Sequence, residues 1–155
     1  MSTSAFEPSD PDFAERIRTS FSRQRVMSTL GASLTRVEPG LVEIALPYRE
    51  DLTQQHAFVH AGITTTIADS AGGYAAYTLM PKASSILTVE FKVNLLAPAR
   101  GERFLARGRV VKPGKRITVC EIEVTAFSDR GQETCLFGMQ TTLCLPETPD
   151  SSSPS

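Results

Sequence analysis

Residues 52–81 carry a single formal charge, the carboxylate of Asp69. Apolar side chains recur through this segment at close to helical spacing, at Ile63, Ile67, Ala71, Tyr74 and Leu79. This spacing predicts a helix from about Ala61 to Leu79, which ends before Pro81. An apolar helix of this length must be covered by another layer of structure. Because a carboxylate is costly to bury without a partner, Asp69 is either a solvated surface residue or a group retained for chemistry.

The chain after this helix is predicted to form strands. The first of them has the clearest two-residue alternation of apolar and polar side chains in the sequence. The strand-like runs comprise residues 87–95, 104–111, 116–127 and 133–145. Turns at Pro113-Gly114 and at 129–131 separate the later runs, and consecutive tight turns predict an antiparallel meander of these strands. The apolar alternation reverses between Val119 and Cys120, which predicts a bulge or burial on both faces.

The N-terminal part of the chain predicts a further helix and a hairpin. Asp10-Pro11 resembles an N-cap followed by proline at the first helical position, and apolar residues at four-residue spacing extend this helix to about Leu30. The runs 32–37 and 41–46 then form a hairpin. This order of elements predicts a single α+β domain over residues 11–145, in which a curved antiparallel sheet packs on the central helix. Residues 1–10 are predicted to be flexible, and the polar tail 146–155 to be disordered.

The composition favours a soluble, cytoplasmic protein without affinity for polyanions. Sixteen Lys and Arg residues balance seventeen Asp and Glu residues, which predicts no general attraction to nucleic acid or to an anionic membrane. No apolar run approaches the ~18 residues of a membrane span, and the N-terminus lacks the pattern of a signal peptide. A nearly neutral surface tolerates self-association. The three cysteines lack a CxxC pair and are expected to be buried, reduced thiols.

The helical neighbours of Asp69 suggest a site that a substrate can approach. A helical wheel places small residues on the same side as the carboxylate: Gly62, Thr65, Thr66, Gly72, Gly73 and Ala76. No Lys or Arg lies between residues 52 and 81 to neutralise Asp69, which favours a role as general base. The alternative is a polar helix face made of threonines and one aspartate.

The predicted start of the helix, Val59-His60-Ala61-Gly62, offers hydrogen-bond donors. The first backbone N–H groups of a helix have no internal partner and carry positive partial charge, so they can stabilise a carbonyl oxygen that gains negative charge. The alternative is an ordinary glycine-containing helix start. His56 and His60 are the only histidines, and since four-residue spacing aligns ligands only within a helix, we expect no metal site.

Residues 100–116 form a basic segment with one acid, Glu102. Its cations are Arg100, Arg103, Arg107, Arg109, Lys112, Lys115 and Arg116. They could bind phosphate groups, or they could belong to a solvated strand face whose charges protect an edge. The chain contains no nucleophile elbow of the GxSxG type, no phosphate loop and no GxGxxG pattern.

The run QQHAFVHAGITTTIADSAGGYAAYTLMP, residues 54–81, resembles the hotdog-fold acyl-CoA thioesterases of the phenylacetate-pathway type. Their hallmark is H-G-G with an aspartate nine residues after the histidine, and His60 and Asp69 have that spacing. The run TVEFKVNLLAPA, residues 88–99, resembles the family strand that ends in a proline-alanine pair. The resemblance covers about residues 30–145 and implies a hotdog fold, an antiparallel sheet wrapped around a long central helix, here with an additional N-terminal helix.

The resemblance also implies roles for individual residues. Asp69 would be the general base or the nucleophile, and the Ala61 N–H would polarise the thioester carbonyl while His60 orients its loop. Gln54 stands where the family often has asparagine, and Thr88 where a serine or threonine positions water or the aspartate. The family site forms between two subunits, so Asp69 would face the other residues across an interface. Ala61 replaces the first glycine of H-G-G, which would narrow the acyl pocket.

The predicted activity is hydrolysis of an acyl-CoA thioester to free CoA and a carboxylic acid, without a cofactor beyond the CoA of the substrate, in a homodimer or homotetramer. Predicted substrate contacts are Val59, Gly62, Thr65, Thr66, Gly72, Gly73, Arg109, Lys112, Lys115 and Arg116. The alternatives are a non-catalytic acyl-CoA-binding or regulatory domain and a hydratase-type enzyme of the same fold. Phenylacetyl, hydroxybenzoyl and medium-chain aliphatic groups all remain open as the acyl group.

Overall fold

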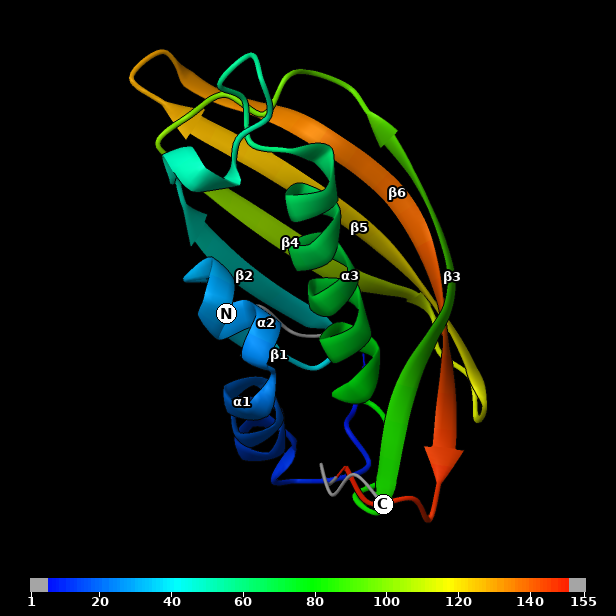
Figure 1. Cartoon of the computed structure of the whole chain (residues 1–155). Helices are drawn as coiled ribbons and strands as arrows, with labels where there is room; N and C mark the ends of the chain where they lie inside the picture. Colours follow the sequence, from blue (N-terminus) through cyan, green and yellow to red (C-terminus); the bar gives the residue numbers. More distant parts are fainter. Residues whose placement is uncertain (1–5, 151–155) are drawn as a thin grey trace.

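In the computed structural model of the protein, one antiparallel sheet curves around the long helix α3, Ala61–Tyr77 (Figure 1). The structure describes residues 6–150. The strands are β1 (Ser33–Glu38), β2 (Leu41–Pro47), β3 (Ser84–Leu95), β4 (Arg103–Lys112), β5 (Ile117–Ser128) and β6 (Gly131–Pro146), in the order β1-β2-β4-β5-β6-β3. The predicted α+β architecture with a central helix is therefore confirmed.

Strand β3 lies at one edge of the sheet, where it pairs with β6 and not with β4. The prediction that the last four strands form one meander is therefore wrong for β3, although β4, β5 and β6 do follow one another. The segment 96–102 carries the chain from β3 across the sheet to β4. Seven extended residues reach about 23 Å, whereas strands three positions apart in a sheet, as β3 and β4 are, lie only about 14 Å apart. The short connection can therefore join two strands that are not neighbours.

Helix α3 lies on the concave face of the sheet and packs on β2, β4 and β5. Residues of α3 that are completely buried include Ile67, Ala71 and Ala75. The helix approaches β4 so closely that a Cβ atom at Gly108 would overlap the backbone of Ala71. Glycine at this position therefore sets the distance between helix and sheet, and the observed helix matches the predicted range to within two residues.

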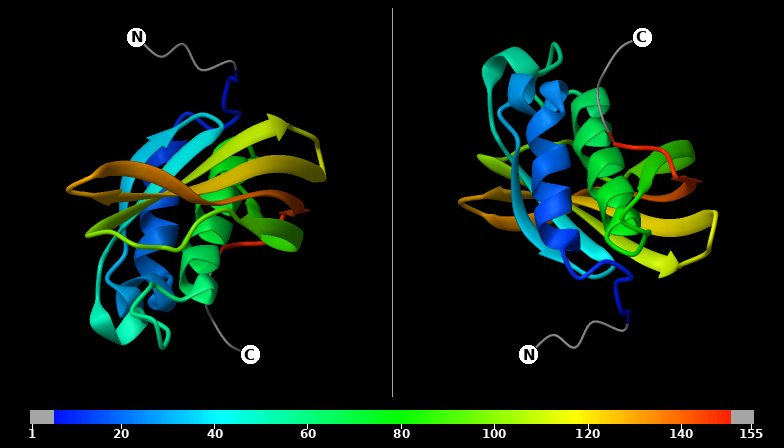
Figure 2. Two further views of the ribbon diagram at one scale, coloured as in Figure 1. Left: turned by 90° about the horizontal axis from the view of Figure 1, so that it is seen from above. Right: turned by 90° about the horizontal axis from the view of Figure 1, so that it is seen from below.

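The predicted N-terminal helix is interrupted, forming α1 (Phe13–Arg23) and α2 (Arg25–Leu30), because Gln24 adopts an extended conformation with ψ of 90°. Helix α1 begins at Phe13, two residues later than the sequence predicted. The Asp10 carboxylate accepts a hydrogen bond from the Asp12 N–H (3.0 Å) and pairs with Arg16 (3.0 Å). Both short helices lie beside α3 on the same face of the sheet (Figure 2).

The irregularity predicted near Val119 and Cys120 occurs in the facing strand. The register in which β4 pairs with β5 shifts between Val110 and Lys112, which lie directly opposite Val119 and Cys120. The inward phase of β5 itself continues without reversal, because the inward position before Cys120 is occupied by the buried Thr118. All three cysteines are buried and free, as expected.

Both ends of the chain reach beyond the described residues. The prediction of flexibility for 1–10 and of disorder for 146–155 falls partly on residues 1–5 and 151–155, which lie outside the described range. Within it, Asp150 pairs with Arg23 at 2.8 Å. In the part of the chain that the structure describes, no helix is long and apolar enough to cross a membrane.

Candidate active site

Asp69 lies in the middle of α3, half-buried, on the side that faces β3 and β6. The Thr88 hydroxyl donates a hydrogen bond to Asp69 Oδ1 at 2.8 Å. The Gln140 amide Nε2 donates to the same oxygen at 2.6 Å. Within residues 6–150, no Lys or Arg forms an ion pair with Asp69. Neutral donors therefore hold the lone acid, and the contact with Thr88 joins two residues that the sequence singled out.

The two oxygens of the Asp69 carboxylate have different surroundings. Oδ1 accepts both side-chain hydrogen bonds, whereas no hydrogen bond from the described residues reaches Oδ2. Asp69 also lines a hollow of about 160 Å³, together with Ser20, Gln24, Ser70, Gly73, Tyr74, Ile86, Thr88 and Asp150. One oxygen of the carboxylate is thus held in place and the other remains available to a substrate or a water molecule.

The start of α3 is capped by His60, whose ring Nδ1 accepts a hydrogen bond from the Gly62 N–H at 2.8 Å. The His60 carbonyl accepts from the N–H groups of Ile63 (2.9 Å) and Thr64 (3.3 Å). In residues 6–150, the Ala61 N–H is consequently the donor of this first turn that has no partner. It carries the positive partial charge of a helix N-terminus, so it can stabilise a developing oxyanion.

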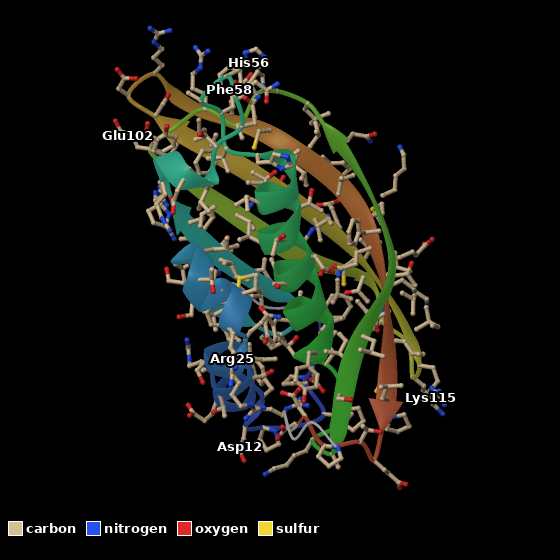
Figure 3. All side chains as sticks on the ribbon, in the orientation of Figure 1. Asp12, Arg25, His56, Phe58, Glu102 and Lys115 are labelled. Atoms are coloured by element: carbon tan, nitrogen blue, oxygen red, sulfur yellow. The ribbon has the colours of Figure 1, made fainter. Side chains whose placement is uncertain are left out.

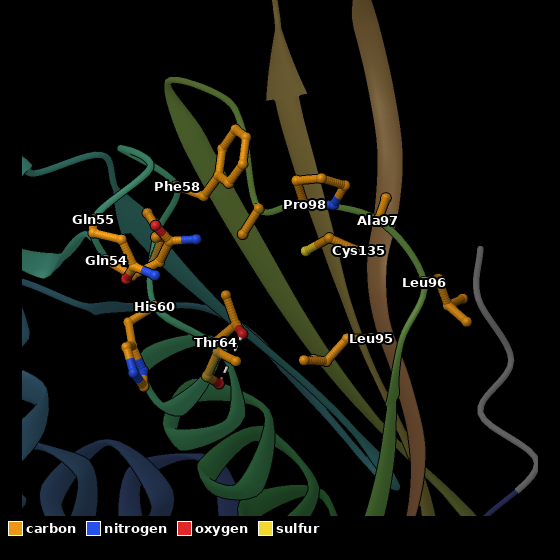
Figure 4. A pocket seen from close by; sticks show the side chains of 13 residues that line it. Gln54, Gln55, Phe58, His60, Thr64, Leu95, Leu96, Ala97, Pro98 and Cys135 are labelled. Carbon is orange, nitrogen blue, oxygen red and sulfur yellow. Dashed lines mark hydrogen bonds between the residues drawn. The ribbon is translucent and has the colours of Figure 1, made fainter.

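Ala61 is one of the residues that line a pocket of about 630 Å³ (Figure 4). The pocket lining comprises Gln54, Gln55, Phe58, Val59, His60, Ala61, Thr64, Leu95, Leu96, Ala97, Pro98, Ala99 and Cys135. In Figure 4, Gln54, His60 and Thr64 lie on one side of the pocket, and Leu95 and Leu96 on the other. Two backbone hydrogen bonds, from Gln54 N–H to Phe58 O (2.9 Å) and from Val59 N–H to Ala99 O (3.1 Å), shape this wall. Besides apolar groups, the lining contains the amides of Gln54 and Gln55, the His60 imidazole, the Thr64 hydroxyl and the Cys135 thiol, but no carboxylate.

Asp69 does not line this pocket. A helical rise of about 1.5 Å per residue separates Ala61 from Asp69 by about 12 Å along the axis of α3. Within one chain, the free N–H and the carboxylate therefore cannot act on the same carbonyl group. The residues that the sequence grouped as one site lie in two separate hollows.

The small residues predicted around Asp69 divide into two groups. A step of about 100° per residue places Gly72 and Gly73 on opposite flanks of Asp69. Gly73 lines the hollow beside the carboxylate, whereas Gly72 is buried against the sheet, where a Cβ atom would overlap the Gln140 Oε1 and Ile122. Gly72 therefore has no open surface for a substrate in this chain, which corrects its predicted role.

The other predicted contacts on the helix lie near its start. Val59 is a buried residue of the large pocket, and Gly62 is exposed. Thr65 and Thr66 are partly exposed, and the Thr66 hydroxyl donates to the Gly62 carbonyl at 2.7 Å. Among residues 6–150, no group of three or more His, Cys, Asp or Glu side chains is arranged to hold a metal ion.

The basic segment is only partly paired. Arg109 forms an ion pair with Glu121 at 3.0 Å. The side chains of Lys112, Lys115 and Arg116 are exposed, and no ion pair involves them within the described residues. Figure 3 shows Lys115 at the opposite end of the molecule from His56 and Phe58. In a single chain, this basic turn is therefore far from the large pocket.

Two features of the site were missed by the sequence reasoning. Gln140 is 1% exposed and holds Asp69. The sequence feature that could have indicated this role is an amide side chain at an inward position of β6, between Gly138 and Thr142. Cys135 lines the large pocket, and burial raises the pKa of its thiol to about 11. Because a thiol rather than a thiolate is present at neutral pH, Cys135 is not an activated nucleophile.

Comparison with known proteins gives a consistent result. The model of the thioesterase superfamily matches residues 56–132. The crystal structure of a thioesterase family protein from Silicibacter pomeroyi is 49% identical, covers 86% of this chain and 98% of its own, and superposes with a TM-score of 0.85.

More distant proteins share the same fold or sequence pattern. The E. coli PaaI protein from the phenylacetic acid degradation operon is 16% identical, covers 88% of this chain and 96% of its own, and has a TM-score of 0.78, which indicates a shared fold. A 1,4-dihydroxy-2-naphthoyl-CoA hydrolase of Listeria monocytogenes is 24% identical over 68% of this chain and 85% of its own. The resemblance and the hotdog fold predicted from residues 54–81 are confirmed.

Proposed function

Since this chain belongs to the thioesterase superfamily and is a thioester hydrolase, we propose that it hydrolyses acyl-CoA thioesters to free CoA and a carboxylic acid. The observation that carries the proposal is the presence of two groups on α3. One is a free N–H at the head of the helix, and the other is an aspartate whose Oδ2 accepts no hydrogen bond in residues 6–150. The similarity to a hydrolase whose name includes a CoA thioester supports the choice of substrate class.

For Asp69 and the Ala61 N–H to act on one carbonyl group, a second copy of the chain would have to supply one of them. The edge strand β3 has Thr88 beside Asp69 and Leu95 beside the large pocket. Antiparallel pairing of two β3 edges about a two-fold axis between residues 91 and 92 would place Thr88 next to the partner's Leu95. Asp69 of one protomer would then approach the Ala61 N–H of the other, so that a dimer holds two complete sites.

The exposed side chains of β3 and of the residue after it support this dimer. They are Leu87, Val89, Phe91, Leu95 and Leu96, each between 44% and 60% exposed. A long edge strand with apolar side chains is prone to aggregation unless another chain covers it. A dimer of such dimers, formed through a further surface, is the proposed tetramer.

The proposed reaction uses the two groups together. The Ala61 N–H donates a hydrogen bond to the thioester carbonyl oxygen and stabilises its negative charge as the carbon becomes tetrahedral. Asp69 either removes a proton from the attacking water or attacks the carbonyl carbon itself and forms an anhydride that water then cleaves. In both routes the carbon–sulfur bond breaks, the CoA thiolate leaves, and water supplies the hydroxyl group of the acid.

The basic turn between β4 and β5 is the proposed contact for the CoA phosphates. In the sheet, Leu143 of β6 pairs with Ile117 of β5 on one side and with Leu87 of β3 on the other. The basic turn before Ile117 therefore lies at the same end of the sheet as Thr88. In the proposed dimer, that end is next to the large pocket of the partner. Lys112, Lys115 and Arg116 would then provide the cations, and Arg109, held by Glu121, would contribute only after releasing that partner.

Measurement of thiol release from phenylacetyl-, hydroxybenzoyl- and medium-chain aliphatic CoA esters tests the proposal. The Asp69→Asn variant should lose at least about 100-fold in turnover, the scale expected for removal of a general base. Asp129→Asn, in the exposed turn after β5, is the matched control and should retain the parental rate. A folded Asp69→Asn variant at the parental rate, or thermal stabilisation by these esters without hydrolysis of any of them, would contradict the proposal.

A further inference from the structure

We propose that Gln140 is a positioning residue for Asp69, which holds Oδ1 of the carboxylate so that Oδ2 faces the substrate. The inference rests on the proposed function, because it assigns a role to a residue that supports the same aspartate. Gln140 lies on β6, on the strand next to Thr88, and reaches across to the middle of α3.

The Gln140 amide contacts three oxygen atoms of this site. Its Nε2 lies 2.6 Å from Asp69 Oδ1, 2.9 Å from the Thr88 hydroxyl and 3.0 Å from the Asp69 carbonyl. The carboxylate and the carbonyl oxygen of Asp69 only accept hydrogen bonds, so the nitrogen and not the oxygen of the amide must face them. The orientation of the side chain is therefore determined by the aspartate and the threonine.

Gln140 also determines which way the Thr88 hydroxyl points. A hydroxyl group has one proton, and when its oxygen accepts from Gln140, that proton is free to point toward Asp69 Oδ1, 2.8 Å away. Both donors thus converge on Oδ1. Thr88 alone would supply one hydrogen bond to a carboxylate that can still rotate, whereas the pair prevents that rotation.

The other end of the amide shows that packing alone does not account for this residue. Gln140 Oε1 is buried and has no hydrogen-bond partner in residues 6–150. It lies against Gly72, where a side chain would overlap it. An unpartnered buried acceptor lowers stability, and a methionine of similar shape would avoid that loss. The hydrogen bonds of the Gln140 amide are therefore made by Nε2, and all of them go to Asp69 and Thr88.

The test compares Gln140→Met with the parent enzyme, using the thioester that the parent hydrolyses fastest. We expect kcat to fall by about tenfold or more, because the reacting oxygen loses its orientation, while KM changes by less than about twofold. The Tm should change little, because removal of the unpartnered Oε1 offsets the loss of the hydrogen bonds to Asp69 and Thr88. Thr142→Val is the matched control: Thr142 is buried on the same face of β6 and bonds the Thr118 carbonyl outside the network, so its kcat should be parental.

A double variant separates positioning from a general structural effect. In the Asp69→Asn background, Gln140→Met should cause no further loss of kcat, because the group that it orients is already gone. An equal loss in both backgrounds, or a loss that accompanies a lower Tm in both Gln140→Met and Gln140→Leu, would overturn the inference. Parental kcat in Gln140→Met with an inactive Asp69→Asn would overturn this inference alone. Parental kcat in Asp69→Asn would overturn the proposed function and the inference with it.

Discussion

The Nδ1 atom of His60 accepts the Gly62 N–H at 2.8 Å, and this bond leaves the neighbouring Ala61 N–H as the open donor at the head of α3. The histidine ring therefore acts as a helix cap, a role more often filled by Ser, Thr, Asp or Asn. The ring accepts the Gly62 N–H and leaves the adjacent Ala61 N–H, the proposed oxyanion donor, open.

His60→Ala should lower stability by about 1 kcal/mol, because the cap is lost, and should also lower activity, because the first turn of α3 is no longer held. His60→Asn should retain most of the stability, since its side-chain oxygen can accept from the same N–H. Urea denaturation measures the difference. Equal stability of the alanine and asparagine variants would show that the cap contributes nothing.

Ala61→Pro should fold normally and lose activity. Proline is favoured at the first position of a helix, and His60 already has the extended conformation, with ψ of 138°, that precedes a proline. The substitution replaces the N–H with a ring carbon, so the donor is lost and kcat should fall by at least about 10²–10³-fold, as when an oxyanion donor is removed. Ala61→Ser, which keeps the N–H, is the control. Full activity of a folded Ala61→Pro variant would exclude this N–H from the reaction.

A mixture of two inactive variants tests whether the site is shared between protomers. A heterodimer of one Asp69→Asn chain and one Ala61→Pro chain would contain one site in which both groups are intact and one in which both are lost. Because one of the two sites in each heterodimer is intact, the purified heterodimer should have about half of the parental activity. Subunits are exchanged by co-expression with two tags, and thiol release is measured on the doubly purified species. Absence of recovery in a verified heterodimer would show that each site belongs to one chain.

Substitution of two adjacent glycines should affect stability in opposite directions. Gly72→Ala would overlap Gln140 and Ile122 and should cost about 1–3 kcal/mol, as overpacking does. Gly73→Ala meets no atom within 4 Å and should stabilise the helix by up to about 1 kcal/mol. Both changes in the free energy of unfolding are measured by urea denaturation, with one common slope of this free energy against urea concentration. A Gly72→Ala variant as stable as Gly73→Ala would mean that the helix is not pressed against β6 at this point.

Stability should decrease in alkaline solution. Burial raises the pKa of Cys120 to about 12 and that of Cys135 to about 11, from an ordinary value of 9.0. Above pH 9, the unfolded chain releases these protons and the folded chain keeps them, so the free energy of unfolding falls as pH rises toward 11. Urea denaturation at pH 8 and pH 10 measures this slope. A Cys120→Ala/Cys135→Ala variant should show a smaller decrease, and an unchanged slope would contradict this assignment.

The local elements of the fold were predictable because each depends on nearby residues. The apolar spacing and Pro81 placed α3 within two residues, and the alternation in 87–95 identified most of β3. Pairing of β3 with β6 was not predictable from the turns, because the segment 96–102 is long enough to reach either neighbour. The break at Gln24 also depends on contacts with other elements, since Gln24 Oε1 accepts a hydrogen bond from Ser70 of α3.

The sequence by itself determined the chemical groups of the candidate site: a lone carboxylate in an uncharged helix and a histidine nine residues before it. Only the tertiary structure decided that Ala61 and Asp69 line two separate hollows and that Gln140 holds the carboxylate. The physical reason is that spacing along a chain sets the face and rise of a helix, whereas strand order sets which distant side chains reach it. Gln140 is 71 residues from Asp69 and meets it only because β6 and β3 pair beside α3.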